Sequence, residues 1–310
     1  MTLNERAIGG LLALACGDAL ANGVEFSPRG SADIKDMNST RRYLPVGQWS
    51  DDTGLALCLG ESLVARNGFD AADQMRRYEG FYDRQEGWPS ELALAPGNTL
   101  GAALKKFKYT DEAFAGSTHP LAAGNGGLMR LLPAVLAAHP DLELIRLWAK
   151  ESTRTTHGAE ECLEASELLA MIVHHLLLGE PKNQALEAGK DEAWKSKKIT
   201  ALAKGDYLQK ADALIKAKSY VVDTLEAALW CFVKTDSLEA ALLAAGNLGD
   251  DCDTVAAITG QLAGCHYGLS AIPADWLNVL VEKDRIEQLA QRLIELTPRY
   301  NRQPGRLNIP

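Results

Sequence analysis

Three aspartates stand within four positions, directly before an apolar helical run, in the stretch 246–268 (GNLGDDCDTVAAITGQLAGCHYG). Carboxylates at a helix start are favoured by the backbone dipole and can cap free N–H groups. One aspartate would satisfy that role, whereas three repel one another unless a positive charge lies between them. Clustered carboxylate and hydroxyl oxygens are also the ligands that hard divalent cations prefer. The stretch therefore has two interpretations, a capped helix start and a metal site.

A second stretch about 200 residues earlier, 47–60 (GQWSDDTGLALCLG), repeats this design. Glycine, acids and threonine again precede an apolar helical run. If the two helix starts meet, they could surround a pair of cations with six oxygen side chains. Neither stretch has the spacing of an EF-hand loop, and no histidine or cysteine cluster suggests zinc. Asp18, a lone aspartate at the end of the first apolar run, is expected to be a hydrogen-bonding residue.

Helical periodicity dominates the remaining sequence, and no segment shows sustained alternation of apolar and polar residues with β-branched enrichment. The first helical run is expected to end at Gly17. We predict an all-α fold, a compact single-domain helical bundle over 1–310 in which the two acidic helix starts meet. Residues 180–212 alternate lysines and acids, which favours a charged, exposed helical insertion or linker over a binding patch. Residues 298–310 form a polar tail.

Composition excludes several classes of protein. The net charge of −9 argues against a nucleic-acid-binding surface, which needs basic patches. No apolar run has the length of a membrane span, and the first residues do not form a signal peptide. The six cysteines include no CxxC pair, and most lie in apolar helical patterns. Reduced, buried thiols of this kind predict a cytoplasmic protein.

Five motifs together resemble the ADP-ribosylglycohydrolase family. They occur in the family's order and span nearly the whole chain. They are GDALANGVE at 17–25, WSDDT at 49–53, GNGGLMR at 124–130, TTH at 155–157 and GDDCDTVAAITGQLAG at 249–264.

The resemblance implies the family's all-helical fold and a binuclear metal site between helix N-termini. Two divalent cations, Mg²⁺ or Mn²⁺, would be held by Ser50, Asp51, Asp52, Asp251, Asp253 and Thr254. The family usually has threonine at the position of Ser50, and both residues offer a hydroxyl oxygen. Many relatives carry glycine at the position of Asp250, so this residue is either an acid behind the ligands or an exposed cap.

The resemblance also gives roles to residues that the sequence alone would leave unremarkable. Glu25 is the expected catalytic carboxylate beside the metals, since cleavage of a glycosidic bond needs a group that activates water or donates a proton. The expected ADP-ribose contacts are Gly97, Asn98, Gly124, Asn125, Gly126, Gly127 and His157. For residues 124–127, the glycine loop, the alternative is a simple tight turn. For His157 the alternative is a core histidine.

The sequence thus predicts a metal-dependent hydrolase that cleaves the bond between ADP-ribose and a modified acceptor, with ADP-ribosyl-arginine on protein as the first expected substrate. Serine-linked or other ADP-ribose conjugates are the alternative substrates. A catalytically silent ADP-ribose-binding protein of the same fold is the alternative class. The expected partner is an ADP-ribosylated protein or an ADP-ribose-containing small molecule, with no nucleic acid and no membrane.

Overall fold

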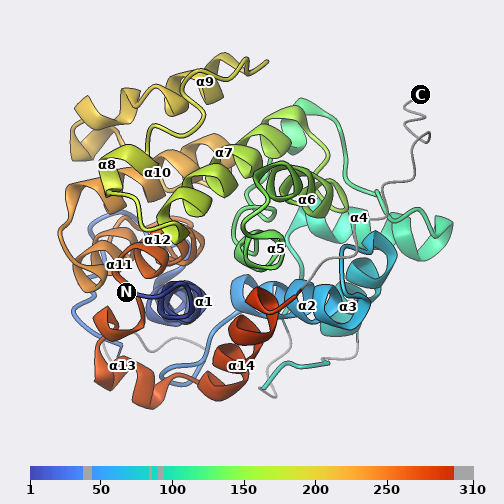
Figure 1. Cartoon of the computed structure of the whole chain (residues 1–310), viewed down its shortest axis with the longest axis horizontal. Helices are drawn as coiled ribbons and strands as arrows, with labels where there is room; N and C mark the ends of the chain where they lie inside the picture. Colours follow the sequence, from blue (N-terminus) through green and yellow to red (C-terminus); the bar gives the residue numbers. More distant parts are fainter. Residues whose placement is uncertain (38–43, 84–85, 90–93, 297–310) are drawn as a thin grey trace.

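Small residues let two helices, α1 (Leu3–Ala21) and α12 (Cys252–Tyr267), run side by side (Figure 1). A Cβ atom added to Gly260 would lie 2.2 Å from the carbonyl oxygen of Ala13, and one added to Gly17 would lie 2.3 Å from that of Ala256. The pairing makes the two helices antiparallel, with their backbones in direct contact. Gly17 therefore does not end the first helix, as the sequence suggested, but lies inside it and permits this approach.

Because the two backbones lie so close together, one added methyl group should have a large effect on the stability of the fold. Gly260→Ala should destabilise the fold by about 1–3 kcal/mol, because the methyl would meet backbone atoms that cannot rotate away. Gly101→Ala in helix α4 (Asn98–Thr110) is the matched control, since the nearest atom outside its helix is 3.4 Å away, on Pro96. Helix propensity should make that variant more stable, by about 0.5–1 kcal/mol. Urea titrations would measure both, and equal effects would contradict the packing argument.

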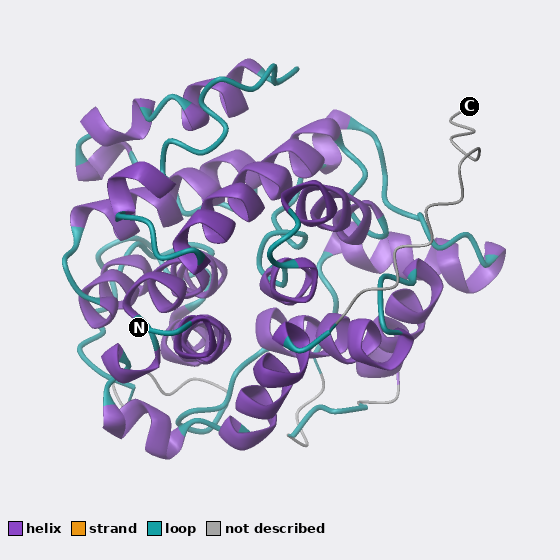
Figure 2. Ribbon diagram, viewed as in Figure 1, coloured by secondary structure: helices purple, strands orange, loops and turns teal. Residues whose placement is uncertain are grey.

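The computed structural model describes residues 1–37, 44–83, 86–89 and 94–296, and in these ranges it contains helices and loops but no strand (Figure 2). The predicted all-α fold is confirmed. The other helices are α2 (Asp51–Arg66), α3 (Ala71–Asp83), α5 (Leu132–Ala138), α6 (Leu142–Arg154), α7 (Glu160–Leu177), α8 (Lys182–Ala185), α9 (Lys197–Ala203), α10 (Val221–Lys234), α11 (Leu238–Gly246), α13 (Ala274–Val279) and α14 (Lys283–Ile294).

Several helix starts are capped by side chains. The Thr2 hydroxyl accepts the N–H of Glu5 and the Glu5 carboxylate accepts that of Thr2, which is a capping box at α1. Asp141 caps α6, and Ser237 caps α11. At α2 and α12, by contrast, the N-cap residues Ser50 and Asp251 make no side-chain cap hydrogen bond.

Helix α1 is a core helix. Together with the short turn that follows, Leu3–Val24 is long and apolar enough to cross a membrane by length and composition. However, 83% of its most apolar window is buried inside the protein, against α12 and its neighbours. The apolar character of this segment is therefore accounted for by packing within the fold.

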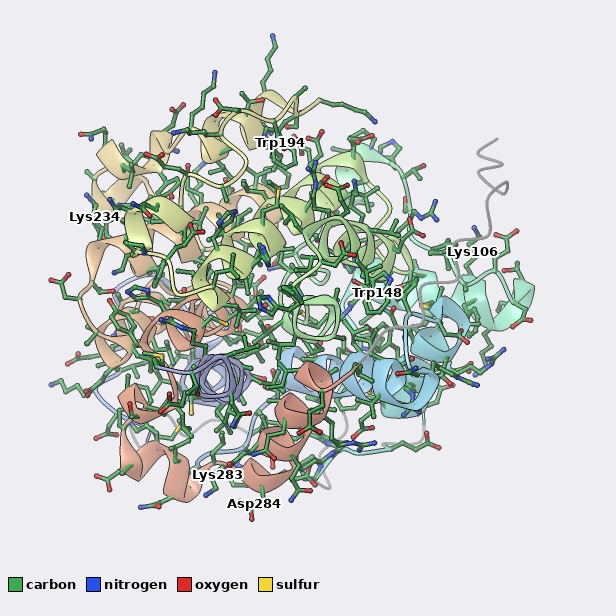
Figure 3. The ribbon with its side chains drawn as sticks, in the orientation of Figure 1. Lys106, Trp148, Trp194, Lys234, Lys283 and Asp284 are labelled. Carbon is green, nitrogen blue, oxygen red and sulfur yellow. The ribbon has the colours of Figure 1, made fainter. Side chains whose placement is uncertain are left out.

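The charged segment 180–212 packs along α7 and α10, at the top of the view in Figure 1. Its apolar residues Ile199 and Leu202 are buried, while the Lys195 side chain is 75% exposed. Trp194, labelled in Figure 3, donates its indole N–H to the carbonyl of Gly189 at 2.8 Å. The segment thus has an apolar inner side and a charged outer side. The predicted tail 298–310 lies outside the described residues.

Candidate metal centre and active-site cavity

A buried carboxylate on α1 fixes the start of α2. Asp18 is fully buried, and its carboxylate accepts the backbone N–H of Ser50 at 2.8 Å and that of Thr53 at 3.0 Å. It also accepts the hydroxyl of Thr53 at 2.7 Å. The predicted hydrogen-bonding role of Asp18 is confirmed. Because Asp18 caps α2 from outside, the side chains of Ser50, Asp51 and Asp52 are released from capping.

The start of α12 is arranged in a similar way. The Asp251 side chain makes no cap hydrogen bond, and its Oδ2 accepts an N–H of the Asn125 amide at 2.9 Å. The Asp253 carboxylate accepts the N–H of Thr254 at 2.9 Å, and both residues are buried. Apart from that one contact, the acids at the two helix starts do not cap their own helices. This favours a metal site over simple helix caps.

Acids from two parts of the chain, the Glu25 loop and the start of α12, converge at one point. Ligand oxygens of Glu25, Asp251 and Asp253 all lie within 4.8 Å of one another. Burial raises the pKa of Asp253 well above its usual range, and the charges of Glu25 and Asp52 raise it further. Burial likewise raises the pKa of Asp52, with added contributions from Asp18 and Asp51. Helices α2 and α12 are in contact, and Asp52 and Asp251 line the same cavity, so the two acidic helix starts meet, as the sequence predicted.

This cluster fits a cation. The Oδ1 atom of Asp52 is buried and has no hydrogen-bond partner among the described residues. Within the described part of the chain, no lysine or arginine forms an ion pair with the aspartates at the two helix starts that line the cluster. An unpartnered carboxylate oxygen among buried acids is costly unless a positive charge joins it. The all-oxygen donor set suits Mg²⁺ or Mn²⁺ better than zinc.

Asp51 occupies the edge of the cluster. Its carboxylate accepts the hydroxyl of Tyr82, on α3, at 2.7 Å. Burial raises the pKa of Asp51 to about 6, although this hydrogen bond opposes the shift. Tyr82 is therefore a supporting residue that holds one expected ligand in place, and no sequence motif identifies it.

Asp250 lies outside the acid cluster. Its carboxylate forms an ion pair with Lys218 at 2.6 Å, and its backbone has a positive φ of 54°. It is neither a cap of α12 nor part of the cluster of Glu25, Asp251 and Asp253. Its backbone instead bonds to the loop that carries Glu25: Phe26 donates its N–H to the Asp250 carbonyl at 2.6 Å, and Asp250 donates to that of Ser27 at 2.8 Å.

The acids open into a cavity of about 1480 Å³. Glu25, Asp52 and Asp251 are among the residues that line it. Of the expected ADP-ribose contacts, all but Gly127 line it: Gly97, Asn98, Gly124, Asn125, Gly126 and His157. Gly127 lies against α6, where an added Cβ would be 2.5 Å from Thr153. Asn125 additionally holds Asp251, so it links the glycine loop to the acid cluster.

The glycine loop rests on His157. A Cβ atom on Gly126 would lie 2.7 Å from the imidazole Cε1 atom, so only glycine allows this contact. Burial lowers the pKa of His157 to about 3, with a contribution from Arg130, which makes the ring neutral at physiological pH. Arg130 is itself buried and donates to the carbonyl of Gly126 at 2.6 Å. It supports the loop from below rather than facing the cavity.

Part of the cavity lining comes from residues that no motif indicated. Lys195, Lys197 and Lys198, in the charged segment 180–212, line the cavity together with Tyr220. Lys198 donates to the Tyr220 hydroxyl at 2.8 Å, and Tyr220 donates to Glu161 in turn. The alternation of charges in this segment predicts a solvated face, but it carries no signal that the chain returns here to the cavity.

Comparisons with known proteins agree with this site. The family model described as ADP-ribosylglycohydrolase matches residues 1–303. The ADP-ribosylarginine hydrolase Tri1 of Serratia proteamaculans (strain 568) is 34% identical over 95% of this chain and 80% of its own length. The ADP-ribosyl-[dinitrogen reductase] glycohydrolase of Rhodospirillum rubrum is 30% identical over 95% of this chain and 96% of its own.

A solved structure shares both the fold and much of the sequence. It is titled ADP-ribosylglycohydrolase-related protein complex, superimposes with a TM-score of 0.83 and is 38% identical. The match covers 95% of this chain and 98% of the solved one. Since the family model, the relatives and the fold agree over nearly every residue, the chain belongs to the ADP-ribosylglycohydrolase family.

Proposed function

We propose that this protein hydrolyses the N-glycosidic bond between ADP-ribose and arginine in ADP-ribosylated protein, and so reverses mono-ADP-ribosylation. One observation carries the proposal: a carboxylate oxygen of Glu25 lies within 4.8 Å of those of Asp251 and Asp253, and Glu25 and Asp251 line a large cavity. Further support comes from the two relatives, whose names specify ADP-ribosylarginine and ADP-ribosyl-[dinitrogen reductase] as substrates.

Two divalent cations, Mg²⁺ or Mn²⁺, would be held by the side chains of Ser50, Asp51, Asp52, Asp251, Asp253 and Thr254. When bound they would neutralise the acids and orient the ribose hydroxyls. Asp18 fixes the backbone of Ser50, whereas Tyr82 and Asn125 hold the side chains of Asp51 and Asp251.

Glu25 is placed to act as the general base. It would take a proton from the water whose oxygen forms the new bond to the anomeric carbon of the ribose, while the bond from that carbon to the guanidine nitrogen breaks. The proton then returns to the leaving guanidine. The neutral His157 and the glycine loop would line the ADP half of the substrate and keep it oriented.

The proposed setting is the cytoplasm, with an ADP-ribosylated protein as partner. The cysteines support it, because all six are free and buried, and burial raises the pKa of the Cys265 thiol to about 12. Such thiols are inert and suit a reducing compartment.

A panel of arginine-, serine- and glutamate-linked ADP-ribose substrates tests the proposal. Release of ADP-ribose should be fastest from the arginine link, should stop in EDTA, and should return with Mg²⁺ or Mn²⁺. Faster release from serine would replace arginine by the serine-linked alternative. Binding of ADP-ribose without turnover of any substrate would identify a silent binder, and full activity after chelation would refute the metal-dependent mechanism.

A further inference from the structure

Phe26, the residue after Glu25, has a backbone that aromatic residues rarely adopt. Its φ of 58° lies in the left-handed region, where a bulky side chain is an outlier. Two reciprocal hydrogen bonds hold it there: its N–H donates to the carbonyl of Asp250 at 2.6 Å, and the N–H of Asp250 donates to that of Ser27 at 2.8 Å. Asp250 is left-handed as well. Strained backbone of this kind concentrates at functional sites, where the rest of the fold maintains it.

Packing does not explain the aromatic ring. Phe26 is 69% exposed, so most of its surface is available to solvent rather than to the core. It nevertheless lines the same cavity as Glu25, Asp51 and Asp251. An asparagine or glycine would take the left-handed conformation at less cost. An exposed ring in a strained backbone beside the catalytic carboxylate therefore points to a contact with something that enters the cavity.

The position of Phe26 next to Glu25 favours a contact with the acceptor half of the substrate. Glu25 and the acids mark the anomeric carbon, because the bond that breaks must lie beside the catalytic carboxylate. The glycine loop and His157 line the same cavity, and the proposed function assigns the ADP half to them. In an arginine-linked substrate the group bonded to the anomeric carbon before cleavage is a guanidinium. It is planar, keeps its positive charge after N-glycosylation, and stacks well on aromatic faces.

We propose that Phe26 is an acceptor-side specificity residue, whose ring stacks on the guanidinium of the ADP-ribosylated arginine. The inference rests on the proposed arginine-linked substrate. The reciprocal bonds between the Phe26–Ser27 backbone and Asp250 fix the backbone that carries the ring in the lining of the cavity, directly after Glu25. In this proposal Phe26 recognises arginine through its aromatic face, whereas other residues that line the cavity recognise ADP-ribose.

Three substitutions distinguish the contribution of the aromatic ring from that of the left-handed backbone. Phe26→Leu keeps an apolar side chain but removes the π face, and should lower kcat/KM for ADP-ribosyl-arginine by about 3- to 30-fold. Phe26→Tyr keeps the face and should remain within about twofold of wild type. Phe26→Asn removes the ring while fitting the left-handed backbone, and should lose as much as the leucine variant without a lower melting temperature. Calorimetry should give the same Kd for free ADP-ribose in all four proteins.

Three results would overturn the inference. They are wild-type kcat/KM in Phe26→Leu, an equal loss in Phe26→Tyr, and a fall in ADP-ribose affinity that matches the fall in kcat/KM. The last result would mean that Phe26 supports the ADP-ribose half. If the wild-type protein itself failed to turn over ADP-ribosyl-arginine, the proposed function would be wrong. Turnover by wild type with an unaffected leucine variant would refute the stacking alone.

Discussion

Asp253→Asn is expected to nearly eliminate hydrolysis of ADP-ribosyl-arginine. The substitution preserves the shape of a side chain that is only 3% exposed, so the cavity should remain intact. It replaces a carboxylate that lies within 4.8 Å of Glu25 and Asp251 by a neutral amide, and carboxylates are the strongest oxygen ligands available to a divalent cation. Turnover assays at saturating Mg²⁺ would measure the loss.

Asp250→Asn is the matched control. It removes a carboxylate three positions away that pairs with Lys218, and asparagine tolerates the left-handed backbone that Asp250 adopts. Activity close to wild type is expected, since the main-chain bonds to the Glu25 loop are kept. Equal losses in both variants would mean that general charge balance, and not ligation, governs activity.

Glu25→Gln should lower kcat by about 10²-fold or more while the affinity for ADP-ribose is largely kept. The amide cannot take a proton from water, but it has nearly the same volume and leaves the loop in place. Because its charge raises the pKa of both Asp52 and Asp253, removing it should also ease repulsion within the cluster. Turnover assays beside calorimetry with ADP-ribose would separate the two effects.

Glu160→Gln offers a comparison for Glu25→Gln within the same cavity. Glu160 also lines the cavity, but its half-exposed carboxylate pairs with Lys195, whose side chain is in open solvent. Ion pairs between such exposed side chains contribute little to the stability of the fold. We expect kcat close to wild type, and a Glu25→Gln variant that retained comparable turnover would remove Glu25 from the catalytic role.

The sequence predicted the elements of the site better than the way in which they are held. The two acidic helix starts could be read because carboxylates before an apolar helical run are a local pattern. The cap that Asp18 provides to α2 depends on how α1 packs, and α1 approaches α12 through glycines such as Gly17. Read locally, Gly17 indicated a helix end, because close approach of a second helix is a tertiary property.

Contacts between distant segments explain what could not be predicted. Tyr82 reaches Asp51 from the far end of another helix, and Lys198 reaches the cavity from a segment whose composition indicates only a solvated surface. Gly127 shares a motif with Gly126, yet it lies against Thr153 rather than in the cavity. The motif marks the loop as a whole, whereas the direction of each residue depends on the helices beneath it.

Thermal scans of the wild-type protein and Asp253→Asn, in EDTA and in millimolar Mg²⁺, test most directly whether these acids hold cations. Without metal the buried carboxylates repel one another, so the variant should melt at or above the temperature of the wild type. Mg²⁺ should stabilise the wild type by RT ln(1 + [L]/Kd), or about 2.7 kcal/mol at a hundredfold excess over Kd, and the variant much less. If Mg²⁺ left the wild-type melting temperature unchanged and the variant were less stable in EDTA, the acids would be structural and the metal centre would be refuted.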